Sequence, residues 1–193
     1  HSWCNWDTPN DGDAVATTAD SGAACAAGVA AGGGANEIVV AAAPHLAMAA
    51  MAARMLRGVA GGTTDGAARA AGCAAMILGD AIEGEARTVA ADHAQRALDG
   101  ARFPKPGAPP IVLLSGGETT VTLSGGLSAA KGGRNTEYLL ALGLALNSAP
   151  RIWAIAADTD GIDGNSGAAG ALLMPWSIAG ASDLGLDPTG ILA

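Results

Sequence analysis

The stretch that decides the fold is Ile111–Thr120, IVLLSGGETT, which is followed at Lys131–Asn135 by KGGRN. Four consecutive apolar residues predict a buried strand, and the glycines behind them allow the backbone to approach a ligand closely. The second pair of glycines opens a helical pattern, and the free N–H groups at the start of a helix attract anions. Together the two stretches place Glu118 and Arg134 at the rim of a sheet and predict a pocket for a phosphate or a carboxylate.

Strands and helices are expected to alternate along the rest of the chain. Apolar runs predict strands at Glu37–Ala42, Ala74–Leu78, Ile111–Leu114, Thr119–Leu123 and Ile152–Ala157. Helical spacing predicts helices at Leu46–Arg57, Glu83–Leu98 and Thr136–Leu146. Glu83 and Glu85 fall in the first turn of the second helix, where the helix dipole favours carboxylates. The alternation indicates a layered α/β sandwich with a largely parallel sheet, in which ligands bind beyond the carboxyl ends of the strands.

A proline-rich segment suggests where the chain divides. Residues 102–110 contain four prolines, which prevent a continuous helix, and we interpret them as a linker. Residues 1–101 and residues 111–193 are then expected to belong to two different α/β domains. Because His1 is no initiator and Ala193 follows directly on a predicted helix, we expect the chain to be an internal fragment.

Composition excludes several classes of partner. The net charge of −8 argues against nucleic acids and anionic membranes, which both require clustered lysine and arginine. The three cysteines are widely spaced and form no Cys-x-x-Cys pair, so neither a disulfide framework nor a zinc site is indicated. No apolar run is long enough to span a bilayer and no signal peptide is recognisable. We therefore expect a cytoplasmic protein with a small-molecule partner.

Three carboxylates follow the predicted strand Ile152–Ala157. Asp158, Asp160 and Asp163 stand within six positions, and glycines at 161 and 164 permit tight turns among them. Clustered oxygen ligands suit a hard cation such as magnesium, and Asp158 and Asp160 are the candidates. The pattern is not an EF-hand loop, because Ile162 occupies a ligand position. The alternative is that these aspartates hydrogen-bond turn amides and cap the next segment.

The other polar candidates also have ordinary structural explanations. Glu118 suits a solvated carboxylate on a glycine turn, and Arg134 and Asn135 suit the surface start of a helix, with Asn135 as its N-cap. Lys131 either steers a phosphate or is simply solvated. The chain contains neither Gly-x-Gly-x-x-Gly nor Gly-x-x-x-x-Gly-Lys-Ser/Thr, which argues against a standard dinucleotide fold or a P-loop. Two histidines are expected to be structural rather than catalytic: His45 and His93.

Three motifs, in this order, resemble class II glycerate kinases. They are Leu113–Thr122, Lys131–Glu137, and Ala156–Gly164 with Ala168–Ala171. Ile77–Asp80 and Glu83–Arg87 are similar to the stretch that precedes the C-terminal domain of that family. The resemblance therefore covers Asn36–Pro188. It implies that residues 1–101 are the C-terminal part of an N-terminal, Rossmann-like α/β domain, and that residues 111–193 are a truncated C-terminal α/β domain of the MOFRL type.

The resemblance also implies an activity and a set of site residues. The family transfers the γ-phosphoryl group of ATP to the 2-hydroxyl of D-glycerate, with magnesium, and gives 2-phosphoglycerate. Arg134 would hold the substrate carboxylate or the transferring phosphate, helped by the N–H groups of Gly133 and Asn135. Asp7 or Glu118 would deprotonate the attacking hydroxyl. Asp158 and Asp160 would position magnesium or substrate. The remaining binding candidates are Ser115, Gly116, Gly117 and Lys131.

The chain also departs from the family pattern. Asp7–Asp11 resembles a degraded copy of a Ser-Asp-Val-Pro-Gly-Asp segment, but Trp6 replaces the serine. The N-terminal half of the family, with its catalytic lysine, is missing, so the chain as written should not be a complete enzyme. Two other functions remain open, namely an NAD(P)H-dependent hydroxypyruvate reductase and a non-catalytic remnant that binds small acids. A homodimer is also open.

Overall fold

The computed structural model describes residues 5–7, 15–17, 36–42, 64–102, 106–122, 131–158 and 161–192. The predicted helix Leu46–Arg57 and the candidate residues His45 and Asp160 lie outside this part of the chain. Two short strands, β1 (Asn5–Asp7) and β2 (Val15–Thr17), pair in antiparallel fashion. None of the helices within the described ranges has the length and apolar character needed to cross a membrane.

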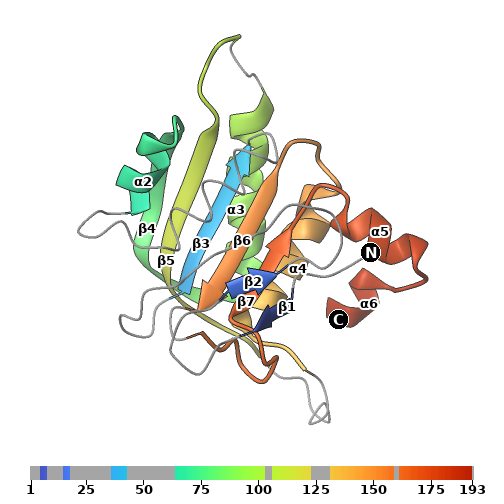
Figure 1. Cartoon of the computed structure of the whole chain (residues 1–193). Helices are drawn as coiled ribbons and strands as arrows, with labels where there is room; N and C mark the ends of the chain where they lie inside the picture. Colours follow the sequence, from blue (N-terminus) through green and yellow to red (C-terminus); the bar gives the residue numbers. More distant parts are fainter. Residues whose placement is uncertain are drawn as a thin grey trace.

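A five-stranded sheet carries the remaining strands (Figure 1). The strands lie side by side in the order β4 (Ala74–Glu85), β5 (Ile111–Thr120), β3 (Asn36–Ala42), β6 (Trp153–Asp158) and β7 (Gly170–Leu173). Strands β4, β5 and β6 share one direction, whereas β3 and β7 run the opposite way. The α/β class expected from the alternating pattern is confirmed, but the sheet is mixed where a largely parallel one was expected, because β4 and β5 pair in parallel and the other three pairs are antiparallel.

Strand β3 lies between the two strands that carry the predicted site. Its first residue, Asn36, stands opposite Gly117 of β5 on one side and opposite Asp158 of β6 on the other. The carboxyl ends of β5 and β6 therefore meet at one edge of the sheet. Strands β3 and β4 precede the proline-rich segment 102–110 and β5 follows it, so a single sheet includes strands from both sides. The division into two domains stays a prediction.

Two long helices cover one face of this sheet (Figure 1). They are α3 (Ala86–Arg102) and α4 (Arg134–Leu146), which also pack against each other. Helix α3 faces the core with alanines at near-helical spacing, and these small side chains lie beside the larger ones of α4. Three shorter helices complete the described fold: α2 (Thr64–Ala70) beside β4, and α5 (Ser177–Asp183) and α6 (Pro188–Leu192) near α4.

The structure corrects two of the predicted boundaries. Strand β4 continues to Glu85 and α3 begins at Ala86, so Glu83 and Glu85 lie in a strand and not in the first turn of a helix. The strand extends because it pairs with β5 as far as Thr120, and Glu85 accepts hydrogen bonds from the backbone and the hydroxyl of Thr122, both at 3.1 Å.

The second correction concerns the glycines of β5. Ile111–Leu114 and Thr119–Leu123 were expected as separate strands, but residues 111–120 form one strand. Gly117 takes a φ of 146°, and the Cβ of any larger residue there would overlap the backbone of Ile82 in β4. The glycine therefore allows the two strands to approach each other where the sequence suggested a turn.

A buried polar pair links α3 to α4. His93 Nδ1 and the hydroxyl of Tyr138 lie 2.8 Å apart, and both residues are almost completely inaccessible to solvent. Burial lowers the pKa of His93; the neighbouring Asp92 raises it and Arg96 lowers it further, leaving it below its ordinary value. His93 therefore serves the helix interface, in agreement with the structural role expected for it.

This pair predicts a loss of stability in mild acid. The unfolded chain binds a proton at His93 more readily than the folded chain, so the free energy of unfolding should fall as the pH drops below about 6.5. Thermal unfolding of the wild type and of His93→Gln, followed from about pH 7.5 to about pH 5.5, checks this. The variant should show the weaker dependence on pH over this interval. Equal slopes would assign the acid sensitivity to other groups.

Candidate functional site

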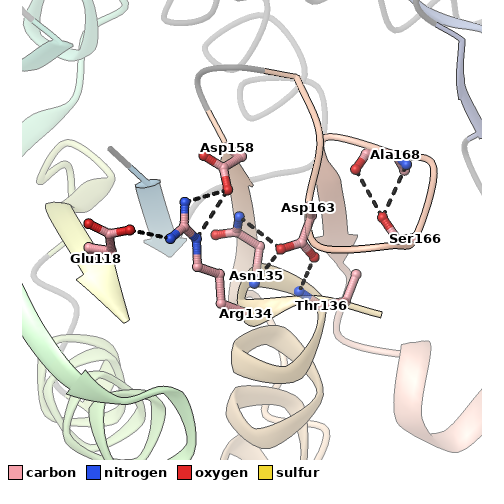
Figure 2. Close-up of polar contacts among 8 residues, drawn as sticks. All are labelled: Glu118, Arg134, Asn135, Thr136, Asp158, Asp163, Ser166 and Ala168. Carbon is pink, nitrogen blue, oxygen red and sulfur yellow. Dashed lines mark hydrogen bonds and ion pairs between the residues drawn. The ribbon is translucent and has the colours of Figure 1, made fainter. Parts of the chain in front are cut away.

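Arg134 connects two carboxylates at the edge of the sheet (Figure 2). Its Nη2 and Nε donate to Asp158 Oδ2 at 2.7 Å and 3.1 Å. Its Nη1 donates to Glu118 Oε1 at 2.7 Å. The three residues come from the start of α4, the end of β6 and the carboxyl-terminal part of β5. The structure thus brings together Glu118, Arg134 and Asp158, which the sequence had predicted as neighbours at the rim of a sheet.

The two carboxylates differ in their access to solvent. The side chain of Asp158 is 2% exposed and that of Glu118 is 66% exposed, with Arg134 between them at 23%. Partial burial by itself lowers the pKa of Arg134, but the hydrogen bonds with Asp158 and Glu118 outweigh it and raise the pKa above the ordinary arginine value. Arg134 is therefore a permanent cation with one buried partner and one partner that solvent or a ligand can reach.

Local sequence explains why these side chains meet. All six residues of β6 are buried, so the first carboxylate after its apolar run, Asp158, stays at the end of the strand inside the protein. Gly133 lies directly before α4, and the Cβ of any larger residue there would collide with Asp163. This close approach brings the first turn of α4, including Arg134, against the loop that follows β6.

The N–H groups at the start of α4 already have acceptors within the chain. The N–H of Asn135 donates to Asp163 Oδ1 at 2.9 Å, and that of Thr136 donates to Asp163 Oδ2 at 2.9 Å (Figure 2). The N–H of Gly133 donates to the hydroxyl of Thr136 at 2.8 Å. An anion would therefore have to compete with these groups for the N–H donors of Gly133 and Asn135. Asn135 lies inside the helix and is not its N-cap.

The other predicted binding residues surround this centre less closely. Ser115 is buried within β5, opposite Ile38 of β3. Gly116 and Gly117 follow it in the same strand, where Gly117 makes the close approach to β4 described above. Lys131 is exposed, three residues before Arg134. Asp7 is the last residue of β1, but its side chain lies outside the described part, so its place in the site stays a prediction.

The described aspartates do not form a metal site by themselves. Within the described residues, no group of three or more His, Cys, Asp or Glu side chains is arranged to hold an ion. Asp158 Oδ2 accepts from Arg134, and both oxygens of Asp163 accept from N–H groups of α4. Asp163 does accept backbone N–H groups, but they belong to α4, upstream in the chain, and not to the next segment, which the alternative from the sequence expected it to cap.

Sequence reasoning missed the contacts that cross from the 161–166 loop to α4. The amide oxygen of Asn165 accepts the N–H of Gly132 at 2.8 Å. Within the start of α4 itself, the hydroxyl of Thr136 donates to the carbonyl of Gly133 at 2.9 Å. A further ion pair, between Arg87 of α3 and Glu137 of α4, measures 2.6 Å. The partners are 33 residues apart in the first case and 50 in the third, and no local pattern signals such pairs.

Part of this chain is similar to a known protein family. Residues 111–193 match the MOFRL family. This is the part that carries Glu118, Arg134 and Asp158, and it begins directly after the proline-rich segment. Residues 111–193 therefore match the family that their motifs resemble.

The curated relatives have names that point to three-carbon acids. A protein of Agrobacterium vitis with the provisional name hydroxypyruvate reductase is 52% identical over 127 residues, which cover 66% of this chain and 29% of that protein. Glycerate 2-kinase of Pyrococcus horikoshii is 33% identical over 121 residues, covering 63% of this chain and 27% of that enzyme. The matching part of this chain thus spans less than a third of the length of these relatives.

Two solved structures share the fold. A glycerate kinase from Thermotoga maritima is 29% identical, with a TM-score of 0.54 over 67% of this chain and 30% of the other. A protein from Pyrococcus horikoshii is 32% identical, with a TM-score of 0.56 over 65% of this chain and 28% of the other. The chain thus shares the mixed α/β architecture of these two structures over about two thirds of its own length.

Proposed function

We propose that the protein is a glycerate kinase, which transfers the γ-phosphoryl group of ATP to the 2-hydroxyl of D-glycerate. The observation that supports this most strongly is Arg134, a permanent cation held at the carboxyl edge of a sheet in a MOFRL segment. The glycerate kinases among its relatives and structural neighbours support the substrate class. A cytoplasmic location and a homodimer belong to the same proposal.

The proposed reaction needs positioning and charge more than covalent chemistry. The hydroxyl oxygen of glycerate attacks the γ-phosphorus, the bond from that phosphorus to the bridging oxygen breaks, and ADP leaves with the bond electrons. Arg134 would bind the substrate carboxylate or the transferring phosphate through the part of the guanidinium near Glu118, at Nη1. Asp158 holds the opposite edge, at Nε and Nη2. Glu118 or Asp7 would accept the proton of the hydroxyl.

Magnesium is the less supported part of this proposal. Asp158 and Asp163 already accept hydrogen bonds from Arg134 and from the start of α4, so the described residues do not fit the ion without Asp160. We therefore derive no step through magnesium. Asp158 and Asp160 remain its predicted ligands.

The reductase name carried by a relative defines the alternative reaction. Hydroxypyruvate and glycerate differ only in the oxidation of one carbon, so a single pocket suits both acids. A reductase also requires a nicotinamide site, and the glycine fingerprint Gly-x-Gly-x-x-Gly does not occur in this sequence. The kinase is therefore the better supported of the two functions.

The test compares the two reactions in one preparation. The protein, purified in its full natural length, is incubated with D-glycerate, ATP and magnesium, and separately with hydroxypyruvate and NADH or NADPH. The proposal expects ADP release that requires glycerate, and phosphorus NMR should identify 2-phosphoglycerate. Nicotinamide oxidation without glycerate-dependent ADP release would replace the kinase with a reductase. Neither signal, in a protein that binds glycerate, would indicate the non-catalytic remnant.

Two substitutions separate the candidates for the base. We expect Glu118→Gln to lower kcat by about 10²-fold or more, since general-base catalysis contributes about 10²–10⁴ and Glu118 contacts Arg134 within the described site. Asp7→Asn should then change kcat much less. Steady-state kinetics at saturating ATP measures both. A near-normal kcat for Glu118→Gln together with a large loss for Asp7→Asn would assign the base to Asp7.

A further inference from the structure

Asp163 is a fully buried carboxylate whose two oxygens are both directed at the start of α4. Its exposed fraction is 0%. Oδ1 accepts the backbone N–H of Asn135 at 2.9 Å and its side-chain amide at 3.3 Å, and Oδ2 accepts the N–H of Thr136 at 2.9 Å (Figure 2). A negative charge at this end of a helix is also favoured by the helix dipole. The carboxylate therefore holds the first turn of α4 from outside the helix.

Two glycines allow this contact to be so close. Gly133 lies against the carboxylate of Asp163, and Gly164, with φ of 58°, lies against the carbonyl of Gly132. Any side chain at either glycine would separate the two segments. Asn165 adds a reciprocal pair of hydrogen bonds with Gly132: Asn165 Oδ1 accepts the N–H of Gly132 at 2.8 Å, and the N–H of Asn165 donates to its carbonyl at 3.1 Å. Residues 163–165 thus hold residues 132–136 along their backbone.

Arg134 lies in the middle of the segment held in this way. Its neighbours in sequence, Gly133 and Asn135, both contact Asp163, and its own side chain extends to Asp158 and Glu118. Side-chain contacts alone leave an arginine free to follow any shift of its backbone. With the backbone fixed by Asp163, the guanidinium has one position relative to the ends of β5 and β6.

From this geometry we propose that Asp163 is a positioning residue, which places Arg134 for the reaction by fixing the first turn of α4. This inference rests on the proposed function, because Arg134 is there the group that meets the substrate. Asp163 is not a base or a metal ligand, because it is fully buried and both its oxygens accept N–H groups. An error of about 1 Å in a positioning group costs about 10²-fold in rate.

The test combines kinetics with hydrogen exchange, in the protein at its full natural length. Asp163→Ala should lower kcat/KM for glycerate by at least about 30-fold, mainly through kcat. In the Arg134→Ala background the same change should cost less than about threefold, because the group that it positions is gone. Asp163→Asn keeps one acceptor oxygen and the size of the side chain, so it should give an intermediate loss of kcat/KM. This variant replaces Asp163→Ala if the alanine variant does not fold. Amide exchange of peptides spanning residues 131–138 should accelerate in both variants.

The control removes a different hydrogen bond between a side chain and the backbone, at the start of α5. Ser177 Oγ accepts the N–H of Met174 at 3.0 Å at the start of α5, and Ser177→Ala should leave kcat unchanged. The inference is overturned if Asp163→Ala and Ser177→Ala have equal effects on kcat, or if Asp163→Ala costs the same factor with and without Arg134. Exchange near residues 131–138 does not depend on the substrate. If the protein has no kinase activity but Asp163→Ala still accelerates this exchange, the proposed function is contradicted and the contact between Asp163 and α4 is not. If Asp163→Ala leaves the exchange unchanged, the contact itself is contradicted.

Discussion

Arg134→Ala is expected to lower kcat/KM for glycerate by about 10²–10³-fold, equivalent to about 3–4 kcal/mol of transition-state stabilisation. The guanidinium is the group in the described site that can meet developing negative charge without changing its own protonation, since its pKa is raised above the ordinary value. Arg134→Lys should recover part of the loss, because lysine keeps the charge but cannot contact Asp158 through two nitrogens and Glu118 through a third.

Arg96→Ala is the control for this prediction. Arg96 is also paired with an aspartate, at 2.7 Å, but it lies on the solvent face of α3. Steady-state kinetics and thermal unfolding should be measured for all three variants, so that a loss of folded protein is not taken for a loss of catalysis. If folded Arg134→Ala retained a near-normal kcat/KM, Arg134 would not be part of the site.

Asp158→Ala is expected to lower the free energy of unfolding by about 2–3 kcal/mol. Removing one partner of a fully buried ion pair costs about 3–5 kcal/mol, and a somewhat smaller loss is expected here because Arg134 still reaches solvent. The loss should be accompanied by reduced activity, since Arg134 would be left with only the exposed Glu118. Asp158→Asn should be milder because its amide oxygen still accepts from the guanidinium. Denaturant unfolding measures both variants.

The control substitution for Asp158 is Asp92→Ala. Asp92 and Arg96 form an ion pair of the same length, 2.7 Å, but both side chains are more than half exposed. Its removal should leave stability at neutral pH unchanged, since exposed pairs contribute little. If Asp158→Ala lowered the free energy of unfolding as little as Asp92→Ala, the burial of the Arg134–Asp158 ion pair would not contribute to stability.

Local pattern was sufficient to predict much of the candidate site. The apolar run Ile152–Ala157 located the end of β6, and the two glycine pairs placed Glu118 and Arg134 at the rim of a sheet, although β5 continues through its glycines to Thr120. The family resemblance added Asp158 to the same site. What could not be predicted depends on distant partners. The N–H of Asn135 finds its acceptor 28 residues away, on Asp163, and nothing in either local pattern specifies that pairing.

The length of β4 also depends on a distant partner and could not be predicted from the local sequence. Glu83 and Glu85 suit the first turn of a helix, and only the neighbouring strand β5 extends β4 through them. Gly117 suits a turn equally well until Ile82 of β4 is known to lie against it. In both cases the contact with the adjacent strand decides the local structure, and propensity does not.

The central position of β3 has a consequence for how the site assembles. Strands β5 and β6 do not pair with each other, because β3, from far upstream in the chain, lies between them and bonds to both. Residues 111–193 on their own would leave two open strand edges facing one another, each a template for pairing with another chain. The distance between Glu118 and Asp158 is therefore established by a non-local pairing of the kind that slows folding and raises the risk of aggregation. A fragment that begins at residue 111 would contain Glu118, Arg134 and Asp158 but would lack β3, the strand that sets the distance between them.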